Sequence, residues 1–265
     1  MISIKEDIDI NSELETPEYE AELQRHYDIS NSLIRCLAFC NMNCSRSEEM
    51  PKKLFFLSII DDIFQSSFAI TILAREGVRN TCRRELRYLI EAAIKSCFIS
   101  QKYSEKTVQG QLEEYKKELK STDISIVDDI DFYMLSDENR VLFKNEIKRM
   151  YGYTSKYIHT TPEQIQERFM LNSKGRTIGM EGLTELKEFN DELEKVYSFV
   201  LVLLFHSVPK WCAGDYLVER DGSTIDWYLS KSKYLADIDG KFDYKYERQA
   251  NISDIVEKRK SNIKF

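Results

Sequence analysis

The sequence predicts an all-α protein, and three observations support that fold class. Glycine and proline are scarce, with 9 and 4 in 265 residues, and such scarcity favours long helices over a turn-rich β fold. Apolar residues recur at helical spacing along most of the chain. Hydrophobic residues make up 42% and charged residues 31%, which suits a globular chain of one large domain or two small ones. We therefore expect an antiparallel helical bundle with a small C-terminal β-hairpin and a basic tail.

The first half of the chain contains most of the expected bundle. Residues 1–17 are acidic and lack periodicity, so we expect a loosely held arm there. Proline at the first helical position and glycine after the last one mark the bounds of the second helix. The third helix has an apolar stripe with a period close to 3.6 residues. The predicted helices are Tyr19–Cys44, Pro51–Glu76, Val78–Tyr103 and Glu105–Lys120.

The bundle is expected to continue to residue 208, so that residues 18–208 form its main body. Ser136 can cap a helix over Asp137–His159, and Thr161 begins a capping box with proline in its first turn. The segment Asn172–Gly182 contains three glycines and is the clearest internal loop. Leu183–Val208 is the last long helix, and its very apolar end is too short to cross a bilayer.

Residues 209–265 differ in character. Tyr216–Glu219 and Thr224–Leu229 flank an Asp-Gly pair, which is a hairpin signal. From Lys241 onward seven Lys or Arg stand against four acids, and a last helix is expected from Ser253. We interpret this basic tail as a solvated segment or a strap on the bundle; contact with nucleic acid or a partner is the alternative.

Composition and missing motifs narrow the function. The net charge of −7 argues against a duplex-DNA coat, and no signal peptide or membrane span is visible, so a soluble cytoplasmic protein is expected. The six cysteines are then reduced thiols. Cys36, Cys40 and Cys44 lack a fourth ligand and are interpreted as small buried hydrophobes, so neither a metal nor a cofactor is predicted. Common nucleotide-binding and hydrolase motifs are missing as well.

The first candidate site lies on the third predicted helix. Arg79, Arg83, Arg87, Glu91 and Lys95 form a ladder at steps of four residues beside the apolar stripe. Arg87 and Glu91 are spaced to pair at the border of the core, where an unpaired charge would be costly. The ladder is therefore either a set of structural ion pairs or part of a functional site.

The second candidate is the segment from Tyr151 to His159, which ends in one of only 3 histidines. Ser155 and Lys156 are expected one turn behind His159 on the same helix. Histidine titrates near neutral pH, as a proton-transfer group must. Tyr153 and Tyr157 could stack on a base, and Lys156 could neutralise a phosphate. The structural alternative is a helix-terminal histidine that bonds carbonyl groups and packs against aromatic rings.

Together these two helices resemble bacterial helical proteins of the HEPN-like kind. The similarity rests on Arg-x-Leu-Ile-Glu-Ala (Arg87 to Ala92) and Ser-Lys-Tyr-Ile-His (Ser155 to His159), and it covers residues 52–208. It implies an antiparallel bundle, frequent dimerisation and metal-independent RNA cleavage in toxin or phage-defence systems. Active members also carry an arginine on the histidine's own helix. At the positions concerned this chain has Gly152, Tyr153 and Thr154.

The resemblance gives a ribonuclease hypothesis in which Arg87 replaces the missing arginine. His159 would deprotonate a ribose 2′-hydroxyl, Glu91 would orient it, and Arg87 would stabilise the phosphorane. The residues expected to contact RNA are Lys156, Tyr157, Tyr153, Arg83 and Ser155.

Two other functions stay open. The chain could be a non-catalytic interaction protein that dimerises or holds a protein partner in a defence complex. It could also be a small-molecule or nucleotide sensor, with Arg87 and His159 lining a pocket between helices. An enzyme needs its cluster around a reachable cleft, whereas a scaffold buries the cluster and exposes a large apolar face.

Overall fold

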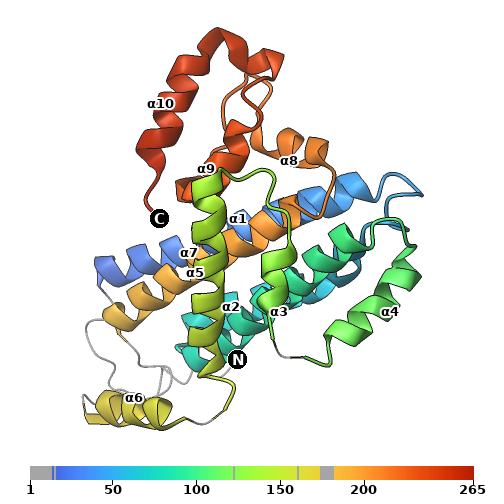
Figure 1. Cartoon of the computed structure of the whole chain (residues 1–265). Coiled ribbons are helices and arrows are strands. Elements are labelled where there is room, and N and C mark those ends of the chain that lie inside the picture. The colour runs from blue at the N-terminus through green and yellow to red at the C-terminus, as the bar shows by residue number, and fades with distance from the viewer. Residues whose placement is uncertain (1–13, 15, 122, 160, 174–181) are drawn as a thin grey trace.

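The computed structural model describes residues 14, 16–121, 123–159, 161–173 and 182–265. Within these ranges the chain forms helices joined by loops (Figure 1). The α-helices are α1 (Pro17–Cys44), α2 (Ile60–Arg75), α3 (Arg79–Lys102), α4 (Val108–Glu118), α5 (Asp137–Ser155), α6 (Pro162–Ser173), α7 (Leu183–Phe205), α8 (Lys210–Leu217), α9 (Lys233–Gly240) and α10 (Ile252–Asn262). The short 3-10 helices are η2 (Phe55–Ile59), η3 (Ser125–Asp129), η4 (Tyr228–Lys231) and η5 (Tyr246–Asn251). The all-α prediction is confirmed.

Helices α1, α2, α3 and α7 form the central bundle, in which each packs against the next and α7 closes the ring against α1. Arg75, at the end of α2, donates to the Tyr27 hydroxyl near the start of α1, so α1 and α2 are antiparallel. A tight turn at Gly77, with φ 71°, reverses the chain into α3. Arg83 near the start of α3 pairs with Glu192 in the first half of α7, and Gln101 at the end of α3 donates to the His206 carbonyl at the end of α7, so these two helices run parallel. The predicted antiparallel packing therefore holds only around α2.

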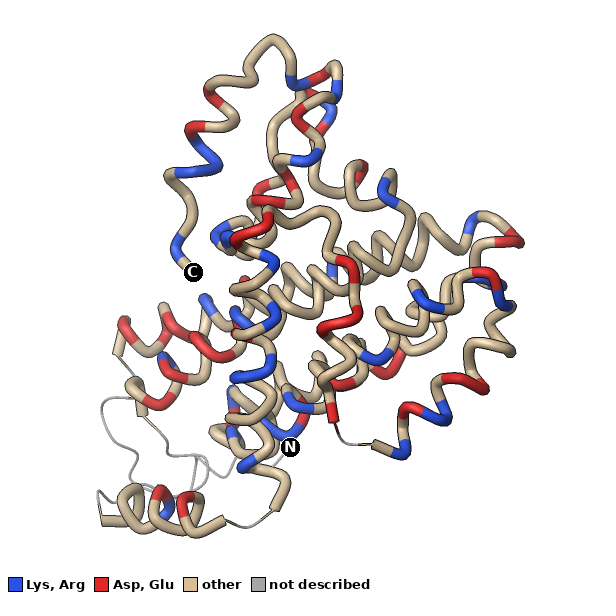
Figure 2. Tube along the Cα trace, in the orientation of Figure 1, with Lys and Arg blue, Asp and Glu red and all other residues tan. Residues whose placement is uncertain are grey.

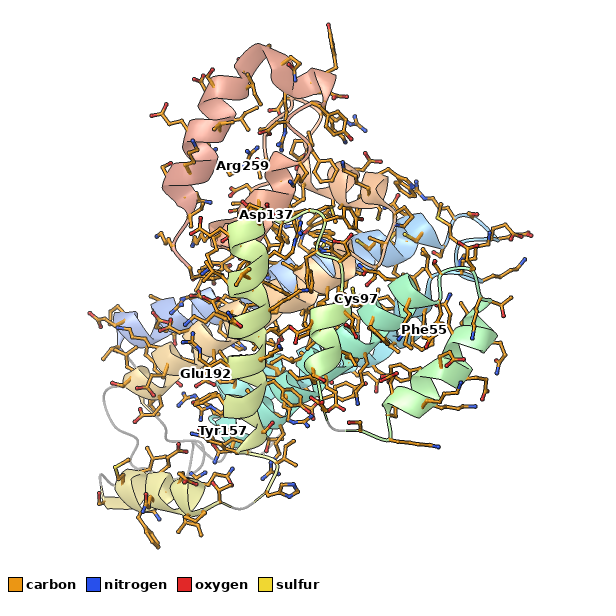
Figure 3. The ribbon with its side chains drawn as sticks, in the orientation of Figure 1. Phe55, Cys97, Asp137, Tyr157, Glu192 and Arg259 are labelled. Carbon is orange, nitrogen blue, oxygen red and sulfur yellow. The ribbon has the colours of Figure 1, made fainter. Side chains whose placement is uncertain are left out.

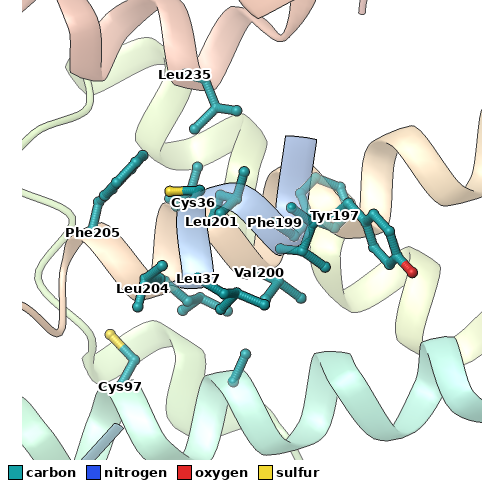
Figure 4. Close-up of a cluster of buried hydrophobic side chains, with 14 of the residues drawn as sticks. Cys36, Leu37, Cys97, Tyr197, Phe199, Val200, Leu201, Leu204, Phe205 and Leu235 are labelled. Atoms are coloured by element: carbon teal, nitrogen blue, oxygen red, sulfur yellow. The ribbon is translucent and has the colours of Figure 1, made fainter. Parts of the chain in front are cut away.

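The core occupies the centre of this ring. The predicted stripe of α3, from Cys82 to Cys97, is buried, and so is Val196–Phe205 of α7 on all its faces. Figure 4 shows the packing of α7 side chains such as Leu201 and Leu204 against Cys36 and Leu37 of α1. A helix that is apolar all round must be surrounded; α7 meets α1, α3, α5, α8 and α9. The prediction of a buried core helix is confirmed.

Capping residues set several helix starts as expected. The Ser136 hydroxyl accepts from the Asn139 amide at the start of α5, and Thr161 accepts from Gln164 at the start of α6. Two predicted bounds differ. The second helix begins at Ile60 rather than Pro51, because residues 51–54 turn toward α4, where the Lys52 carbonyl accepts from the Val108 amide at 2.9 Å. Helix α5 ends at Ser155 rather than His159.

The predicted β-hairpin is wrong. Helix α8 occupies the start of its first arm, and the described residues contain a single antiparallel bridge, between Val218 and Thr224. The turn itself forms, with Gly222 at φ 83°. A Cβ on Gly222 would lie 2.1 Å from the Glu247 carbonyl oxygen, so η5 packs directly on this turn. Among the described residues, the last backbone hydrogen bond between the arms runs from the Ile225 amide to the Leu217 carbonyl, and the Thr224 hydroxyl bonds Asp239 at 2.9 Å.

The C-terminal segment is packed onto the bundle. Leu217, Leu235 and Phe242 belong to the same apolar cluster as α7, so the core continues across residue 209. Up to Glu257 the tail's basic residues are interspersed with acids, and the last four basic residues follow without one (Figure 2). Arg248 is fully buried and pairs with Asp239 at 2.5 Å, and Arg259 reaches the same carboxylate at 2.6 Å. These pairs fasten the tail to α9, within the same C-terminal segment.

All six cysteines are free and buried. Cys44 on α1 lies 3.8 Å from Cys212 on α8, measured between the sulfur atoms. Burial contributes to raising the pKa of Cys36 and Cys97, which keeps these thiols protonated. Among the described residues there is no group of three or more histidine, cysteine or carboxylate side chains placed to hold a metal ion.

Candidate functional site

Helix α3 places the predicted cationic ladder inside the protein. It contacts α2 and α7 within the bundle, and α5 crosses it from outside. Its basic side chains therefore face protein rather than solvent: Arg87 is 8% exposed and Lys95 is 0% exposed. Cations buried to this degree need anions and hydrogen-bond acceptors beside them.

Arg87 finds all its partners within the protein. One terminal nitrogen donates to Glu91, the other donates to the Tyr151 hydroxyl, and Nε donates to the Ser155 hydroxyl at 3.0 Å. Its guanidinium carbon also lies 4.1 Å from the centre of the Tyr151 ring. Every nitrogen of Arg87 is thus engaged between α3 and α5.

Glu91 is engaged in the same way. One of its oxygens accepts from Arg87, and the other accepts from the Lys95 ammonium at 2.6 Å. Lys95 also donates to the Ser121 carbonyl at 2.6 Å. Burial works to raise the pKa of Glu91, but the hydrogen bonds and charges of Lys95 and Arg87 outweigh it, so the pKa lies below its ordinary value. Glu91 is a carboxylate held between two cations. We call Arg87, Glu91, Lys95, Tyr151 and Ser155 the inner cluster.

A second network lies one turn earlier on α3. Arg83 forms a bidentate salt bridge with Glu192 of α7, in which both N–O distances are 2.8 Å. The Tyr153 hydroxyl donates to the same carboxylate at 2.8 Å, and the Tyr157 hydroxyl donates to Glu167 of α6 at 3.1 Å. Figure 3 shows Tyr157 near the end of α5 and Glu192 on α7. This network fastens α3, α5, α6 and α7 to one another.

Electrostatics keep this network in one charge state. Burial works to lower the pKa of Arg83, but the hydrogen bonds and charge of Glu192 raise it above its ordinary value. Burial raises the pKa of both Tyr153 and Tyr157, so their hydroxyls stay protonated and act as donors. The Tyr157 ring is not free to stack on a base, since it is buried beneath Arg83, whose guanidinium carbon lies 4.8 Å from the ring centre.

The structure separates His159 from these networks. Because α5 ends at Ser155, residues 156–158 form a turn, and His159 follows it as an exposed residue. No hydrogen bond or ion pair joins His159 to another described residue, and Glu91 is bound to Arg87 and Lys95 instead. Lys156 is exposed as well, with its ammonium 5.8 Å from the centre of the Tyr153 ring. Of the predicted site, Arg87, Glu91 and Ser155 come together.

Sequence reasoning missed three members of these networks. Tyr151 lies one turn before Ser155, so the helical period that places Ser155 beside α3 could have placed Tyr151 there too. Glu192 stands in an acidic run at the start of an otherwise apolar helix, which marks it as a partner for a buried cation. The Ser121 carbonyl gave no sequence signal, because a backbone acceptor carries no side-chain identity.

The inner cluster has little capacity for chemistry. Its two cations are both bonded to Glu91, and this carboxylate is too strongly stabilised as an anion to take up a proton near neutral pH. A cavity of about 450 Å³ beside it is lined by Tyr151, Ser121 and Lys148, without Arg87 or His159. The arrangement is that of a structural clasp between α3 and α5.

Whereas α3 buries charged side chains, the outer side of α2 exposes apolar ones. Phe68 is 52% exposed and Ile72 is 60% exposed, and the Phe64 ring stacks on Phe68 with centres 6.4 Å apart. Among the described elements, α2 has its main contacts with α1, α3 and η2. We call Asp61, Phe64, Phe68, Ile72 and Arg75 the outer stripe.

Residues 55–75, which include α2, are also long and apolar enough to cross a membrane. A single helix of this kind is weak evidence for a membrane span, because a core helix of a globular protein has the same length and composition. The most apolar part of these residues is only 33% buried, so α2 is an incompletely covered helix. The outer stripe is therefore a second candidate site.

Comparisons with protein-family models, curated proteins and solved structures find no match for this chain. The inner cluster and the outer stripe are the features of the described residues that bear on function.

Proposed function

We propose that this protein is a HEPN-like helical interaction protein that holds a protein partner on the outer side of α2 and acts without catalysis. The observation that carries the proposal is the exposure of Phe68 and Ile72 on a helix whose other sides are packed. Contiguous exposed apolar surface is characteristic of interaction sites in globular proteins. The defence or toxin setting rests on the resemblance alone and stays a prediction.

The state of the inner cluster favours this function over RNA cleavage. A ribonuclease of the expected kind needs a cation facing the phosphorane and a base near it. Arg87 has every nitrogen engaged by Glu91, Tyr151 and Ser155. Releasing it would break its hydrogen bonds to Glu91, Tyr151 and Ser155 in a mostly buried position, which is costly. The cluster is better suited to fixing α5 on α3 than to receiving a substrate.

Rigid support is what an interaction surface requires. The inner cluster and the Arg83–Glu192 pair hold α3 against α5 and α7, and α3 in turn supports the inner side of α2. A surface on a well-packed helix loses little conformational entropy when a partner binds. The polar networks thus serve the outer stripe indirectly, by keeping its helix in place.

Photo-crosslinking from the outer stripe tests the proposal. A benzoylphenylalanine at position 68, in cells that express the protein, should give one adduct of defined mass. The same group at position 246 is the matched control, since Tyr246 is 90% exposed but lies in the C-terminal segment. Adducts equal in yield at both positions, or none at position 68, would contradict a partner on α2.

An assay of RNA cleavage distinguishes the competing hypothesis. Purified protein is incubated with total RNA and tRNA in EDTA, wild type beside His159→Ala. We expect no cleavage by either protein. Cleavage by the wild type that is lost in His159→Ala would establish the ribonuclease and overturn the non-catalytic proposal.

A further inference from the structure

The C-terminal segment contains a cavity of about 260 Å³ that shares no residue with the inner cluster or the outer stripe. Its apolar walls come from α8, α9, α10 and the stretch between α8 and η4: Leu217, Ile225, Trp227, Leu235, Ala236 and Ile255. Three of them, Leu217, Trp227 and Leu235, also belong to the main apolar core, which fixes their positions. An apolar cavity of about 150 Å³ admits a benzene ring. This cavity therefore has room for two fused rings or for one ring with a short chain.

Helix α10 forms one wall of the cavity without packing into it. The helix lies at the edge of the molecule, and none of its residues is buried (Figure 1). Ile255 is the apolar residue that α10 contributes to the lining, and it is only partly buried. A helix that packed directly on its neighbours would bury such a side chain. The space beneath α10 is therefore left for another molecule.

A neutral group of four charged residues holds the middle of α10. Arg259 donates from Nε to Asp239 of α9 at 2.6 Å and from a terminal nitrogen to Asp243 at 2.9 Å. Arg248 bonds the same two carboxylates. Two cations thus face two anions, and Arg259 fixes α10 at this distance from α9.

The end of α10 is held separately. The Asn262 side chain donates to the Ser230 hydroxyl at 2.8 Å, and the Lys233 amide donates to the Phe265 carbonyl at 2.7 Å. These bonds join the end of the chain to η4 and to the start of α9. Because α10 is anchored at two places, it cannot settle into the cavity without breaking one set of bonds. The cavity is part of the folded structure.

The charges that line the cavity favour an uncharged ligand. The charged side chains there that no described residue bonds are Asp226 and Lys258, and both are exposed. They have opposite signs, so a charged ligand would be attracted by one and repelled by the other. It would also have to give up its water against apolar walls, which is costly for an ion. An uncharged ligand meets neither penalty.

The lining also offers hydrogen bonds to an uncharged polar group. Trp227 is held edge-to-face against Tyr216, with ring centres 5.1 Å apart, and its indole N–H has no acceptor among the described residues. The side-chain oxygen of Asn262 likewise has no donor in the described part of the chain, since its bond to Ser230 uses the nitrogen. One donor and one acceptor suit a hydroxyl group, which can both accept and donate.

We propose that the cavity beneath α10 binds an uncharged, mainly apolar small molecule of one or two rings that carries a hydroxyl or similar group. This site goes beyond the proposed function, because it lies in the C-terminal segment and requires no partner on α2. Its apolar walls supply the affinity, and its neutral charge balance supplies the selectivity.

Three indoles that differ in charge test the ligand class. Tryptophol is uncharged, indole-3-acetate is an anion and tryptamine is a cation near neutral pH, while the ring system stays the same. Isothermal titration calorimetry of the full-length protein is expected to show tryptophol binding at least about tenfold more tightly than either ion. Equal affinity for all three would overturn the uncharged class. No binding of tryptophol or of the slimmer 1-hexanol at millimolar concentration would overturn the site.

Filling the cavity tests the location. Ala236 is 6% exposed and lines the cavity from α9, so Ala236→Leu places a larger side chain in it while keeping a good helix former. We expect this variant to lose tryptophol binding and to unfold at the same temperature as the wild type or a higher one. Ala21→Leu, at an exposed position of α1, is the matched control and should bind as the wild type does. Binding that is undiminished in Ala236→Leu would place the ligand elsewhere and overturn the site.

A second variant acts from α10, so that the test does not depend on the folding of Ala236→Leu. Ile255→Asp places a carboxylate against the apolar walls and is expected to weaken tryptophol binding at least about tenfold. Because α10 has no buried residue, the rest of the fold should be kept, and circular dichroism checks this. Val256→Asp, one residue further along α10 and outside the lining, is the control and should bind tryptophol normally. Equal weakening in the two variants would assign the effect to α10 as a whole and overturn the cavity as the binding site.

Discussion

Helices α2 and α3 follow one another in the chain and pack side by side, yet they distribute their residues in opposite ways. Helix α3 turns charged side chains inward, with Lys95 fully buried and Arg87 nearly so. Helix α2 turns aromatic and aliphatic side chains outward, at Phe68 and Ile72. Each helix departs from the ordinary rule that apolar residues face the core and charges face water.

The two departures differ in whether they are compensated. Every cation of the inner cluster has an anion or carbonyl group within hydrogen-bonding distance, so burial leaves no charge unsatisfied. The outer stripe has no covering element among the described residues. A compensated departure is a structural device, whereas an uncompensated one indicates a partner. For this reason the uncovered surface of α2, rather than the sequence motifs on α3, indicates where a partner binds.

The largest expected effect comes from removing the anion of the inner cluster. Glu91→Ala leaves Arg87 and Lys95 buried together without a carboxylate, which is expected to cost about 3–5 kcal/mol of unfolding free energy. Glu113→Ala is the control, because Glu113 pairs with Lys116 on the exposed face of α4 and its removal should change stability little. Urea denaturation of both variants measures the difference. Similar losses in the two variants would show that the inner cluster is not a structural device.

A smaller effect on stability is expected from the protonation of two buried histidines. Unlike the buried cations of α3, they have no carboxylate bonded to them. Burial lowers the pKa of His26 and of His206 from 6.5 to about 4. The unfolded state therefore binds more protons between these values, so stability is full above pH 6.5, falls as the pH drops toward 4 and then levels off. The loss by pH 5 is about 2 kcal/mol for each histidine.

Urea denaturation at pH 7 and pH 5 measures this loss. His206→Gln should remove about half of the pH dependence, since only His26 then titrates in this way. His159→Ala is the control, because His159 is exposed and no described residue bonds it. A pH dependence that is unchanged in His206→Gln would assign the loss to other groups.

The smallest of these effects concerns the attachment of α5 to α7. Tyr153→Phe removes the hydroxyl that donates to Glu192 at 2.8 Å. Because Arg83 still holds Glu192 through two bonds, the expected loss is about 1 kcal/mol in unfolding free energy. Tyr246→Phe, at an exposed position, should be neutral. A loss several times larger for Tyr153→Phe would mean that the Arg83–Glu192 pair depends on the hydroxyl, and the two networks would have to be treated as one.

Much of the secondary structure could be predicted because its causes are local. The period of Cys82, Leu86 and Leu89 identified the buried side of α3, and Ser136 and Thr161 marked helix starts through bonds within one turn. The pairing of Arg87 with Glu91 was also predictable, since residues four apart on a helix are neighbours. The Asp-Gly turn formed, but its arms did not pair as strands; Thr224 bonds distant Asp239, and the Glu247 backbone packs against Gly222.

By itself, then, the sequence determined the helical class, the apolar stripes and the inner ion pair, all of which depend on spacings within a single helix. Tertiary structure decided what those helices face. It brought Glu192 within hydrogen-bonding distance of Arg83 and Tyr151 within that of Arg87. It also ended α5 before His159 and left Phe68 and Ile72 of α2 uncovered among the described elements. The physical reason is that burial and partnership depend on which helices lie next to one another, and that follows from the packing of the whole bundle.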